Sequence, residues 1–290
     1  MIEIRACRGF EELEACVQLE IDTWGYDPTD LVPRKTFLLA QKVGGQVIGA
    51  FENREQGSEG ARERKGREQG SEGARGRKGR EQGSEGARER ENESPRPHLV
   101  GFAMALPGIK NTASGPTPYL HSHMLAVKDG YRNQGLGFRL KLEQRVEALS
   151  RGIPRMEWTF DPLEIKNAYL NIHRLGAVIR EYRPDFYGVS SSRLQGGLPT
   201  DRLLAEWELD SDRVQATLNG LSAVACSIEE RIQVPAAIYQ WKAEDRDRHR
   251  ALAVQFENRE KFQRAFQKGL AVMGFSLDAE GNGVFELGRL

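Results

Sequence analysis

The sequence predicts an α/β or α+β domain: a mixed, mostly antiparallel central sheet flanked by helices, extended at the C-terminus by a helix and a β-hairpin. Apolar runs typical of strands alternate with segments whose apolar residues recur every three or four positions, as on one face of a helix. A glycine-rich turn separates a strand from a helix near the middle of the chain. Near the C-terminus, Gly281-Asn282-Gly283 lies between two apolar runs and favours a hairpin.

The elements are expected in the order βααβββαβαβ before the C-terminal part begins. A short strand over 2–7 leads into a helix over 9–24, and a second, shorter helix is expected within 27–43. The apolar face of the first helix would comprise Phe10, Leu13, Cys16, Val17 and Ile21. Later elements are strands over 46–52 and 98–106, a loop rich in Pro, Gly and Asn over 107–118, a strand over 119–127, a helix over 138–150, a strand over 155–162, a helix over 165–176 and a strand from 177.

The C-terminal part differs in its pattern. It is expected to hold a strand over 203–209, a long helix over 247–269 and the closing hairpin. On the helix, Leu252, Phe256, Phe262 and Phe266 form an apolar stripe suited to packing against a sheet.

A charged repeat interrupts the chain between two predicted strands. The segment "REQGSEGARERKG" recurs as "REQGSEGARGRKG" and then in part again, with a period of 13 residues. Such a composition buries too little apolar surface to fold, so residues 52–97 are expected to be disordered. We therefore expect a first domain over 1–190, interrupted by the repeats at a hairpin tip, and an extension over 191–290 that packs on it.

Composition excludes several classes of function. The 42 basic residues balance 42 acidic ones, which does not favour nucleic acid or an anionic membrane as a partner. Cys7, Cys16 and Cys226 show no metal-type spacing and suit a reducing compartment. The N-terminus lacks an apolar signal region, and no window is apolar enough to span a membrane. A cytoplasmic location is expected.

The turn "GYRNQGLG" has three interpretations. A P-loop would need Lys after its last glycine, where Leu136 stands, and a dinucleotide fingerprint would need glycine where Leu140 stands. The third interpretation is R-x-x-G-x-G at Arg132, Gly135 and Gly137, between a strand and a helix. Backbone N–H groups at such a helix N-terminus hold a phosphate-type anion, although an ordinary strand-to-helix turn has the same glycines.

The surroundings of this turn favour the anion site. "MLAVKDGYRNQGLGFRL" resembles motif A of the GNAT superfamily of acyl-CoA-dependent N-acyltransferases, and "NAYLNIHRLGAV" looks like motif B. The resemblance covers roughly Met1 to Gly188 without the repeats. With "LPTDRLLAEWEL", the tail looks like the extended, poorly characterised predicted-acetyltransferase branch of that superfamily.

The resemblance implies a GNAT-like fold that binds acetyl-CoA or another acyl-CoA as co-substrate, with no metal. The motif A strand would splay from its neighbour and pair with the pantetheine arm through Leu125, Ala126 and Val127. The pyrophosphate would lie on the N–H groups of Arg132, Asn133, Gln134, Gly135, Leu136 and Gly137. Phe138 would begin the helix, and Asn167 matches the motif B asparagine that contacts the cofactor.

The implied chemistry is direct attack of an amine on the thioester in a ternary complex. His123, with His121 two residues earlier on the same face, is the candidate general base, because an ordinary histidine titrates near neutrality. Both histidines could instead only satisfy hydrogen bonds. The usual acid, a Tyr four residues before the motif B glycine, is replaced by Ile172. Tyr169 or His173 could substitute, or the thiolate could leave without a dedicated acid.

The acceptor is expected over the sheet, near the first two helices. Candidate acceptor residues are Glu20, Trp24, Trp158 and Asp161, with Tyr26 and Phe160 beside them, although aromatic residues at such positions more often belong to the core. Arg180, Arg183 and Tyr187 are expected near the rim of the sheet, where an arginine either binds a carboxylate or forms part of a solvated surface. A small-molecule amine or an amino acid is the expected acceptor, and a homodimer would match the habit of the superfamily. The alternative function is a catalytically degenerate GNAT domain that binds acyl-CoA as a sensor or interaction module.

Overall fold

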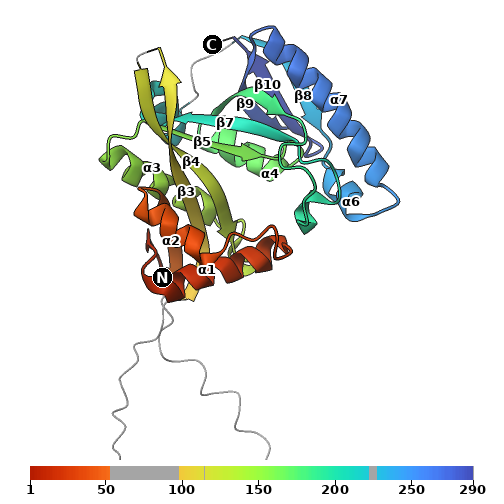
Figure 1. Cartoon of the computed structure of the whole chain (residues 1–290). Helices are drawn as coiled ribbons and strands as arrows, with labels where there is room; N and C mark the ends of the chain where they lie inside the picture. The colour runs from red at the N-terminus through yellow and green to blue at the C-terminus, as the bar shows by residue number, and fades with distance from the viewer. Residues whose placement is uncertain (53–97, 114, 222–226, 290) are drawn as a thin grey trace, which may run out of the picture.

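The computed structural model describes residues 1–52, 98–113, 115–221 and 227–289 (Figure 1). The described strands form one ten-stranded sheet in the order β1-β2-β3-β4-β5-β7-β6-β9-β10-β8. All the strand pairs recorded for this part of the chain are antiparallel except β4 with β5. The predicted fold class is therefore confirmed. The repeat insertion and Cys226 lie outside the described residues.

The first half of the sheet is an antiparallel meander. β1 (Ile2–Ala6) pairs with β2 (Gln46–Glu52), followed by β3 (His98–Thr112) and β4 (Gly115–Val127). Glu52 pairs directly with His98, so the chain leaves and re-enters the sheet at neighbouring positions on either side of the repeats.

The expected loop over 107–118 is wrong, because β3 and β4 continue as a paired arm to Thr112 and Gly115. The arm extends past the last β2 pair at Ala105. In the part of the chain that the structure describes, both outer edges of the arm therefore lack a neighbouring strand, and prolines are tolerated there because no ladder hydrogen bond requires their missing N–H. The prolines in residues 107–118 therefore lie in strands with an unpaired outer edge and not in a loop.

Two helices cover one face of this half, and a third covers the other. α1 (Gly9–Trp24) and α2 (Arg34–Lys42) pack on β3 and β4 through a cluster that includes Leu13, Cys16 and Phe37. α3 (Leu136–Ser150) packs on the opposite face through Leu136 and Leu140.

The apolar face predicted for α1 is only partly right. Leu13 and Cys16 are buried as expected, whereas Phe10 is 60% exposed. Leu19 and Glu20 are buried in addition. A buried carboxylate at the C-terminal end of this helix is the feature that the periodicity did not suggest.

The second half of the sheet begins where β5 (Arg155–Phe160) runs parallel to β4. β7 (Arg202–Glu208) lies between β5 and β6 (Val178–Arg183) and pairs with both. Beyond β6 lie β9 (Ala271–Leu277), β10 (Gly283–Gly288) and β8 (Ile228–Val234). The sheet therefore runs without interruption across the boundary expected at residue 190, and β7 completes the first seven strands.

The helices of this half complete the architecture. α4 (Ile165–Ala168) continues as the π-helical segment η2 (Tyr169–Arg174), and α5 (Asp212–Leu218) and α6 (Ile238–Ala243) precede the long α7 (Arg248–Gln267). On α7, Phe262 is fully buried, whereas Phe256 of the predicted stripe is 44% exposed. Among the residues described here, no helix is long and apolar enough to cross a bilayer, and no cluster of His, Cys, Asp and Glu could hold a metal.

Candidate active site

The site is organised by a wedge between the parallel strands β4 and β5. Only Leu120 and His121 of β4 pair with β5, opposite Met156 and Glu157. β4 then continues to Val127 and β5 to Phe160 without pairing with each other. The backbone edge of Leu125, Ala126 and Val127, which sequence analysis assigned to the cofactor, borders this wedge and has no β5 partner in the described chain.

A β-bulge lies at the narrow end of the wedge. Met104 of β3 pairs with Met124, but the next residue, Ala105, pairs with Ser122, so His123 is the additional residue in β4. A bulge of this kind bends the strand and redirects the side chains next to it. The bulge lies two residues after His121, the last residue of β4 that pairs with β5.

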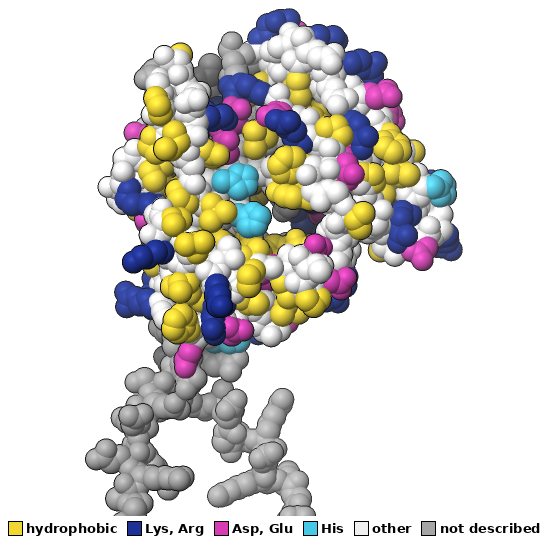
Figure 2. All heavy atoms as spheres, viewed as in Figure 1, with side chains coloured by type: hydrophobic (Ala, Val, Ile, Leu, Met, Phe, Trp, Pro, Cys, Tyr) yellow, Lys and Arg dark blue, Asp and Glu magenta, His cyan; other side chains and the backbone are white. Residues whose placement is uncertain are grey.

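The bulge places the two histidines on one side of the sheet. Ser122 points toward α3, where its hydroxyl donates to Gln144 Oε1 at 3.0 Å and accepts from Lys141 Nζ at 2.7 Å. His121 and His123 flank Ser122 on the other side, with ring centroids 6.2 Å apart. Figure 2 shows two adjacent histidine side chains beside a hollow in the middle of the face it presents.

The pKa values of both histidines are lowered. Burial, and then the nearby His123 ring, lower the pKa of His121 to about 4. The side chain of His123 is more exposed, and partial desolvation by the surrounding protein also lowers its pKa below its ordinary 6.5. Both rings are therefore neutral at pH 7 and able to accept a proton, which a general base requires.

Glu157 is a neighbour of these histidines that sequence analysis missed. It pairs with His121 across the two strands, its side chain is buried, and its carboxylate is paired with Lys110. Its negative charge opposes the fall in the pKa of His121. The sequence places Glu157 in the strand that follows the helix after the glycine turn. Only the parallel pairing of β4 with β5 shows that it lies beside His121.

The glycine turn forms an open N-terminus for α3. Gly135 is the N-cap at φ 75°, and Asn133 is also left-handed at φ 61°. The first hydrogen bond of the helix runs from Arg139 N–H to Gly135 O at 3.1 Å, so the preceding N–H groups of Leu136, Gly137 and Phe138 point into the turn. The helix thus begins at Leu136, two residues earlier than predicted.

Side chains around the turn leave this N-terminus accessible. No side chain caps it, and a Cβ atom added to Gly135 would meet no atom within 4 Å. Arg132 is held at the strand end, with Nε donating to Val127 O at 3.0 Å and Nη1 2.7 Å from Asp129 Oδ1. The side chain of Gln134 donates to Gly130 O at 3.0 Å. The arrangement suits an anion held by backbone N–H groups.

The motif B segment packs beside the same helix end. A Cβ atom at Gly137 would lie 3.9 Å from Leu170, and the guanidinium of Arg174 lies 4.6 Å from the ring centroid of Phe138. Asn167 is exposed one helical turn before Leu170. The motif B segment therefore packs against the end of α3 at which the glycine turn lies.

The residues around the expected position of a general acid lie in the motif B segment. Ile172 is buried in the core, which agrees with an apolar residue at that position. Tyr169 and His173 stack on each other with ring centroids 4.5 Å apart. In the described chain, neither ring is in contact with or hydrogen-bonded to His121 or His123.

Two of the four predicted acceptor residues lie on the histidine side of the sheet. Glu20 and Trp24 are in the last two turns of α1, and Trp24 stacks on Tyr26 with centroids 5.7 Å apart. Glu20 is fully buried; its Oε1 accepts from Val32 N–H at 2.9 Å, and Oε2 has no hydrogen-bond partner among the described residues. Burial raises the pKa of Glu20 to about 7.

The other two predicted acceptor residues lie elsewhere. Trp158 is buried in the core, with Lys141 Nζ 3.7 Å from its ring centroid. Asp161 is buried and ion-paired with Lys242 at 2.9 Å. Asp161 follows the end of β5 at Phe160. For Trp158 strand alternation is the reason, because Trp158 points to the α3 side and the next residue, Thr159, points to the histidine side. There Thr159 Oγ1 lies 2.9 Å from the hydroxyl of Tyr187.

Comparisons with known proteins give structural matches only. No protein-family model matches the chain, and no curated protein matches it by sequence. The ribosomal-protein-S18-alanine N-acetyltransferase of Escherichia coli is 13% identical, covers 73% of this chain and 96% of its own, and has a TM-score of 0.43. NAA60 of Arabidopsis thaliana, in complex with a bisubstrate analogue, is 16% identical with 71% and 98% coverage and a TM-score of 0.44. A GNAT family acetyltransferase from Elizabethkingia anophelis with acetyl-CoA bound is 14% identical with 71% and 97% coverage and a TM-score of 0.40.

At these identities and TM-scores the likeness is partial, and the fold is better judged from the geometry of the chain itself. Its first seven strands are continuous in the order β1-β2-β3-β4-β5-β7-β6. The motif A strand splays from its neighbour, as the resemblance of the sequence implied, and leads into an open helix N-terminus. The described chain thus combines this strand order with a splayed strand and an open helix N-terminus.

Proposed function

We propose that the protein is an acyl-CoA-dependent N-acyltransferase that transfers an acyl group, most simply acetyl, to the amine of a small molecule or amino acid. The observation that carries the proposal is the β4–β5 wedge, which has a bulged, neutral histidine at its narrow end and an open helix N-terminus beside its wide end. One end suits proton transfer and the other suits a phosphate anion.

The residues present fit the acyl-CoA that such a reaction needs. Leu136, Gly137 and Phe138 offer N–H groups to a pyrophosphate, and the positive end of the α3 dipole adds to the attraction. The β4 edge of Leu125, Ala126 and Val127 lies next to this turn and offers backbone groups to an extended amide chain. The thioester supplies an activated acyl carbon, and the remaining chemistry falls to the protein.

His123 is proposed as the general base. An amine is mostly protonated at neutral pH and must lose a proton before or during attack on the thioester carbonyl. The neutral ring of His123 accepts this proton, while His121, whose pKa is about 4, remains neutral beside it. Tyr169 and His173 are proposed as alternatives for the general acid that protonates the leaving thiolate. Their rings stack on each other.

Glu20 and Trp24 are proposed to face the acceptor. A buried carboxylate with one oxygen lacking a partner favours a hydrogen-bond donor or a cation nearby, and an ammonium group supplies both. The stacked Trp24 and Tyr26 rings beside it offer an apolar wall for the acceptor's carbon skeleton.

A second candidate function is an acyl-CoA sensor without turnover. The buried Ile172, which stands where the usual acid would be, favours it. The two functions differ in one observable, the release of free thiol from acyl-CoA when an acceptor is added.

The test is therefore an assay of thiol release from acetyl-CoA and succinyl-CoA over a panel of amines and amino acids. We expect release that depends on the acceptor and falls about 100-fold or more in His123→Asn. His249→Asn, a change to an exposed histidine on α7, is the matched control and should retain full activity. Donor binding without release on any acceptor would favour the sensor.

A further inference from the structure

The connection between β6 and β7, residues 184–201, contacts β5 on the same side of the sheet as the histidines. Its Tyr187 hydroxyl reaches Thr159 Oγ1 of β5 at 2.9 Å. Its Ser191 accepts from Asp27 N–H at 3.0 Å and donates through Oγ to Asp30 Oδ2 at 2.6 Å. This β6–β7 segment therefore joins β5 to the loop that follows α1 and carries Tyr26.

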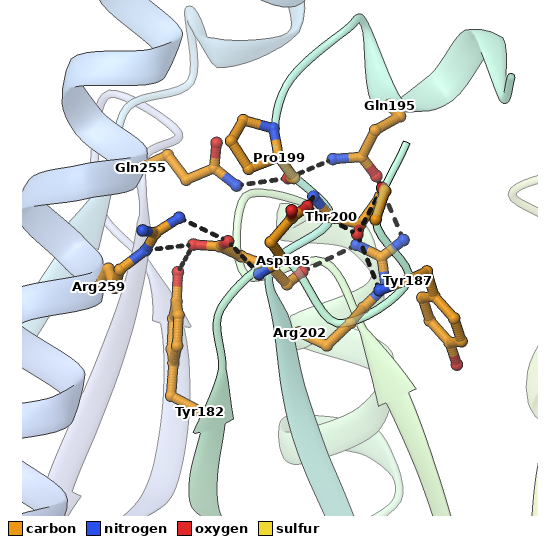
Figure 3. Close-up of polar contacts among 11 residues, drawn as sticks. Tyr182, Asp185, Tyr187, Gln195, Pro199, Thr200, Arg202, Gln255 and Arg259 are labelled. Carbon is orange, nitrogen blue, oxygen red and sulfur yellow. Dashed lines mark hydrogen bonds and ion pairs between the residues drawn. The ribbon is translucent and has the colours of Figure 1, made fainter. Parts of the chain in front are cut away.

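Side chains of helix α7, in the C-terminal extension, form hydrogen bonds with the same segment (Figure 3). Arg259 donates to both carboxylate oxygens of Asp201, with Nε 2.9 Å from Oδ2 and Nη2 2.7 Å from Oδ1. Asp201 is fully buried, and the Tyr182 hydroxyl also donates to it, at 2.5 Å. One turn earlier on α7, Gln255 donates to Pro199 O at 2.8 Å.

A chain of hydrogen bonds connects this anchor to Tyr187. Asp201 Oδ1 accepts from Asp185 N–H at 2.9 Å, and Asp185 Oδ1 accepts from Thr200 N–H at 3.1 Å. Thr200 Oγ1 in turn accepts from Tyr187 N–H at 2.9 Å. Asp185 holds a left-handed backbone at φ 43°, which this network maintains. The backbone of Tyr187 is thus positioned relative to a carboxylate whose partner is on α7.

We propose that Arg259 is a positioning residue for the acceptor site, and that the C-terminal extension sets the wall formed by Tyr187 and the loop after α1. The inference rests on the proposed function, because it assigns the acceptor to the wedge beside the histidines. Arg259 acts through Asp201 and Tyr187. A buried carboxylate requires its hydrogen-bonded partner, so loss of Arg259 forces Asp201, and the segment attached to it, to find a new arrangement.

The experiment compares Arg259→Gln and Arg259→Lys with Arg264→Gln, a control at an exposed arginine on the same helix. We expect Arg259→Gln to raise the KM for the acceptor about tenfold or more, while the Kd for acetyl-CoA changes less than about twofold. Arg259→Lys should recover part of the loss, because it keeps the charge but not the paired donors. Hydrogen exchange should become faster at residues 186–193 in the Gln variant and stay unchanged in the control.

Two results would overturn the proposal: an unchanged acceptor KM in a folded Arg259→Gln protein, or unchanged exchange at residues 186–193. Where Arg259→Gln alone fails to fold, the double variant Arg259→Gln with Asp201→Asn removes both charges and serves the same comparison. Failure of the proposed function appears differently, as a wild-type protein that binds no acyl-CoA. The exchange measurement still decides in that case whether Arg259 fixes the segment.

Discussion

At the scale of single residues, the central proposal is that His123 acts as the general base. Its place as the additional residue in β4 follows from the register of β3 against β4. The sequence indicated a histidine near the turn, but the bulge that presents it depends on pairing with a strand whose partner residues are far away in the chain.

The pH dependence of the reaction tests the role of His123. Because partial desolvation lowers its pKa below 6.5, the ring stays unprotonated at neutral pH and its activity is lost only as pH falls below that value. We expect kcat/KM to be flat through pH 7 and to fall in a limb below pH 6.5. In His123→Asn the residual rate should lack this limb. An identical limb in the variant would assign it to another group.

Glu20 gives a second prediction, which concerns stability rather than rate. Its folded pKa of about 7 lies above the ordinary 4.5, so the folded state resists ionisation and the unfolded state does not. The stability of the protein should therefore decrease as pH rises from about 4.5 to about 7 and remain lower above that, by at most about 3 kcal/mol. Glu20→Gln removes this effect.

Thermal unfolding of Glu20→Gln and wild type measures it directly. We expect equal melting temperatures at pH 4 and a higher melting temperature for the variant at pH 8. A constant difference at every pH would mean that Glu20 is not the titrating group.

At the scale of elements, the wedge is closed at its narrow end by a buried amine from α3. Lys141 is 3% exposed; its Nζ donates to Ser122 and lies over Trp158, and no carboxylate accompanies it among the contacts of the described residues. Burial lowers the pKa of Lys141 well below its ordinary value. Below its ordinary pKa, protonation thus favours the unfolded chain, and stability falls as pH decreases from about 10.5.

Lys141→Met tests this reading. Methionine keeps the length of the side chain and needs no hydrogen bond, and the Ser122 hydroxyl retains its bond to Gln144. We expect the variant to melt at a higher temperature than wild type at pH 7, with a smaller gap at pH 10. A lower melting temperature at both values would show that the Lys141–Ser122 hydrogen bond outweighs the cost of burying the amine.

Local patterns predicted most of the elements that build the site, including the motif A strand, the glycine turn and the helix after it. They missed the features that depend on pairing between distant segments. The stretch 107–118 reads as a loop because its prolines and glycines are turn residues, and only its position beyond β2 allows it to be a strand arm. Trp158 reads as an acceptor residue because the sequence does not say which face of β5 meets α3.

At the scale of the whole molecule, the sheet joins the parts of the chain that composition seemed to divide. β7 belongs to the expected extension, yet it lies between β5 and β6, and Arg259 on α7 pairs with Asp201 just before β7. Local sequence patterns could not indicate the position of β7 between β5 and β6, because strand order depends on pairing between segments that are distant in the chain.

Deletion of residues 53–97 tests how far the site depends on the repeat. Glu52 and His98 are paired neighbours, so a short Asn-Gly turn can join them directly. We expect the deleted protein to keep the melting temperature and the acetyl-CoA affinity of the full chain. A loss of donor binding on deletion would give the repeat a part in the site.

The measurement that tests the account most directly is calorimetric titration of acetyl-CoA and free CoA into the wild type, Gly135→Asn and Gly135→Asp. Asn and Asp are the residues that best tolerate a left-handed backbone, and a Cβ atom at Gly135 would meet no atom within 4 Å. They differ in one negative charge at the proposed pyrophosphate site. We expect binding by wild type and Gly135→Asn, and affinity lower by about tenfold or more in Gly135→Asp than in Gly135→Asn. No binding of either CoA species by the wild type, or equal affinity in the two variants, would contradict the acyl-CoA site.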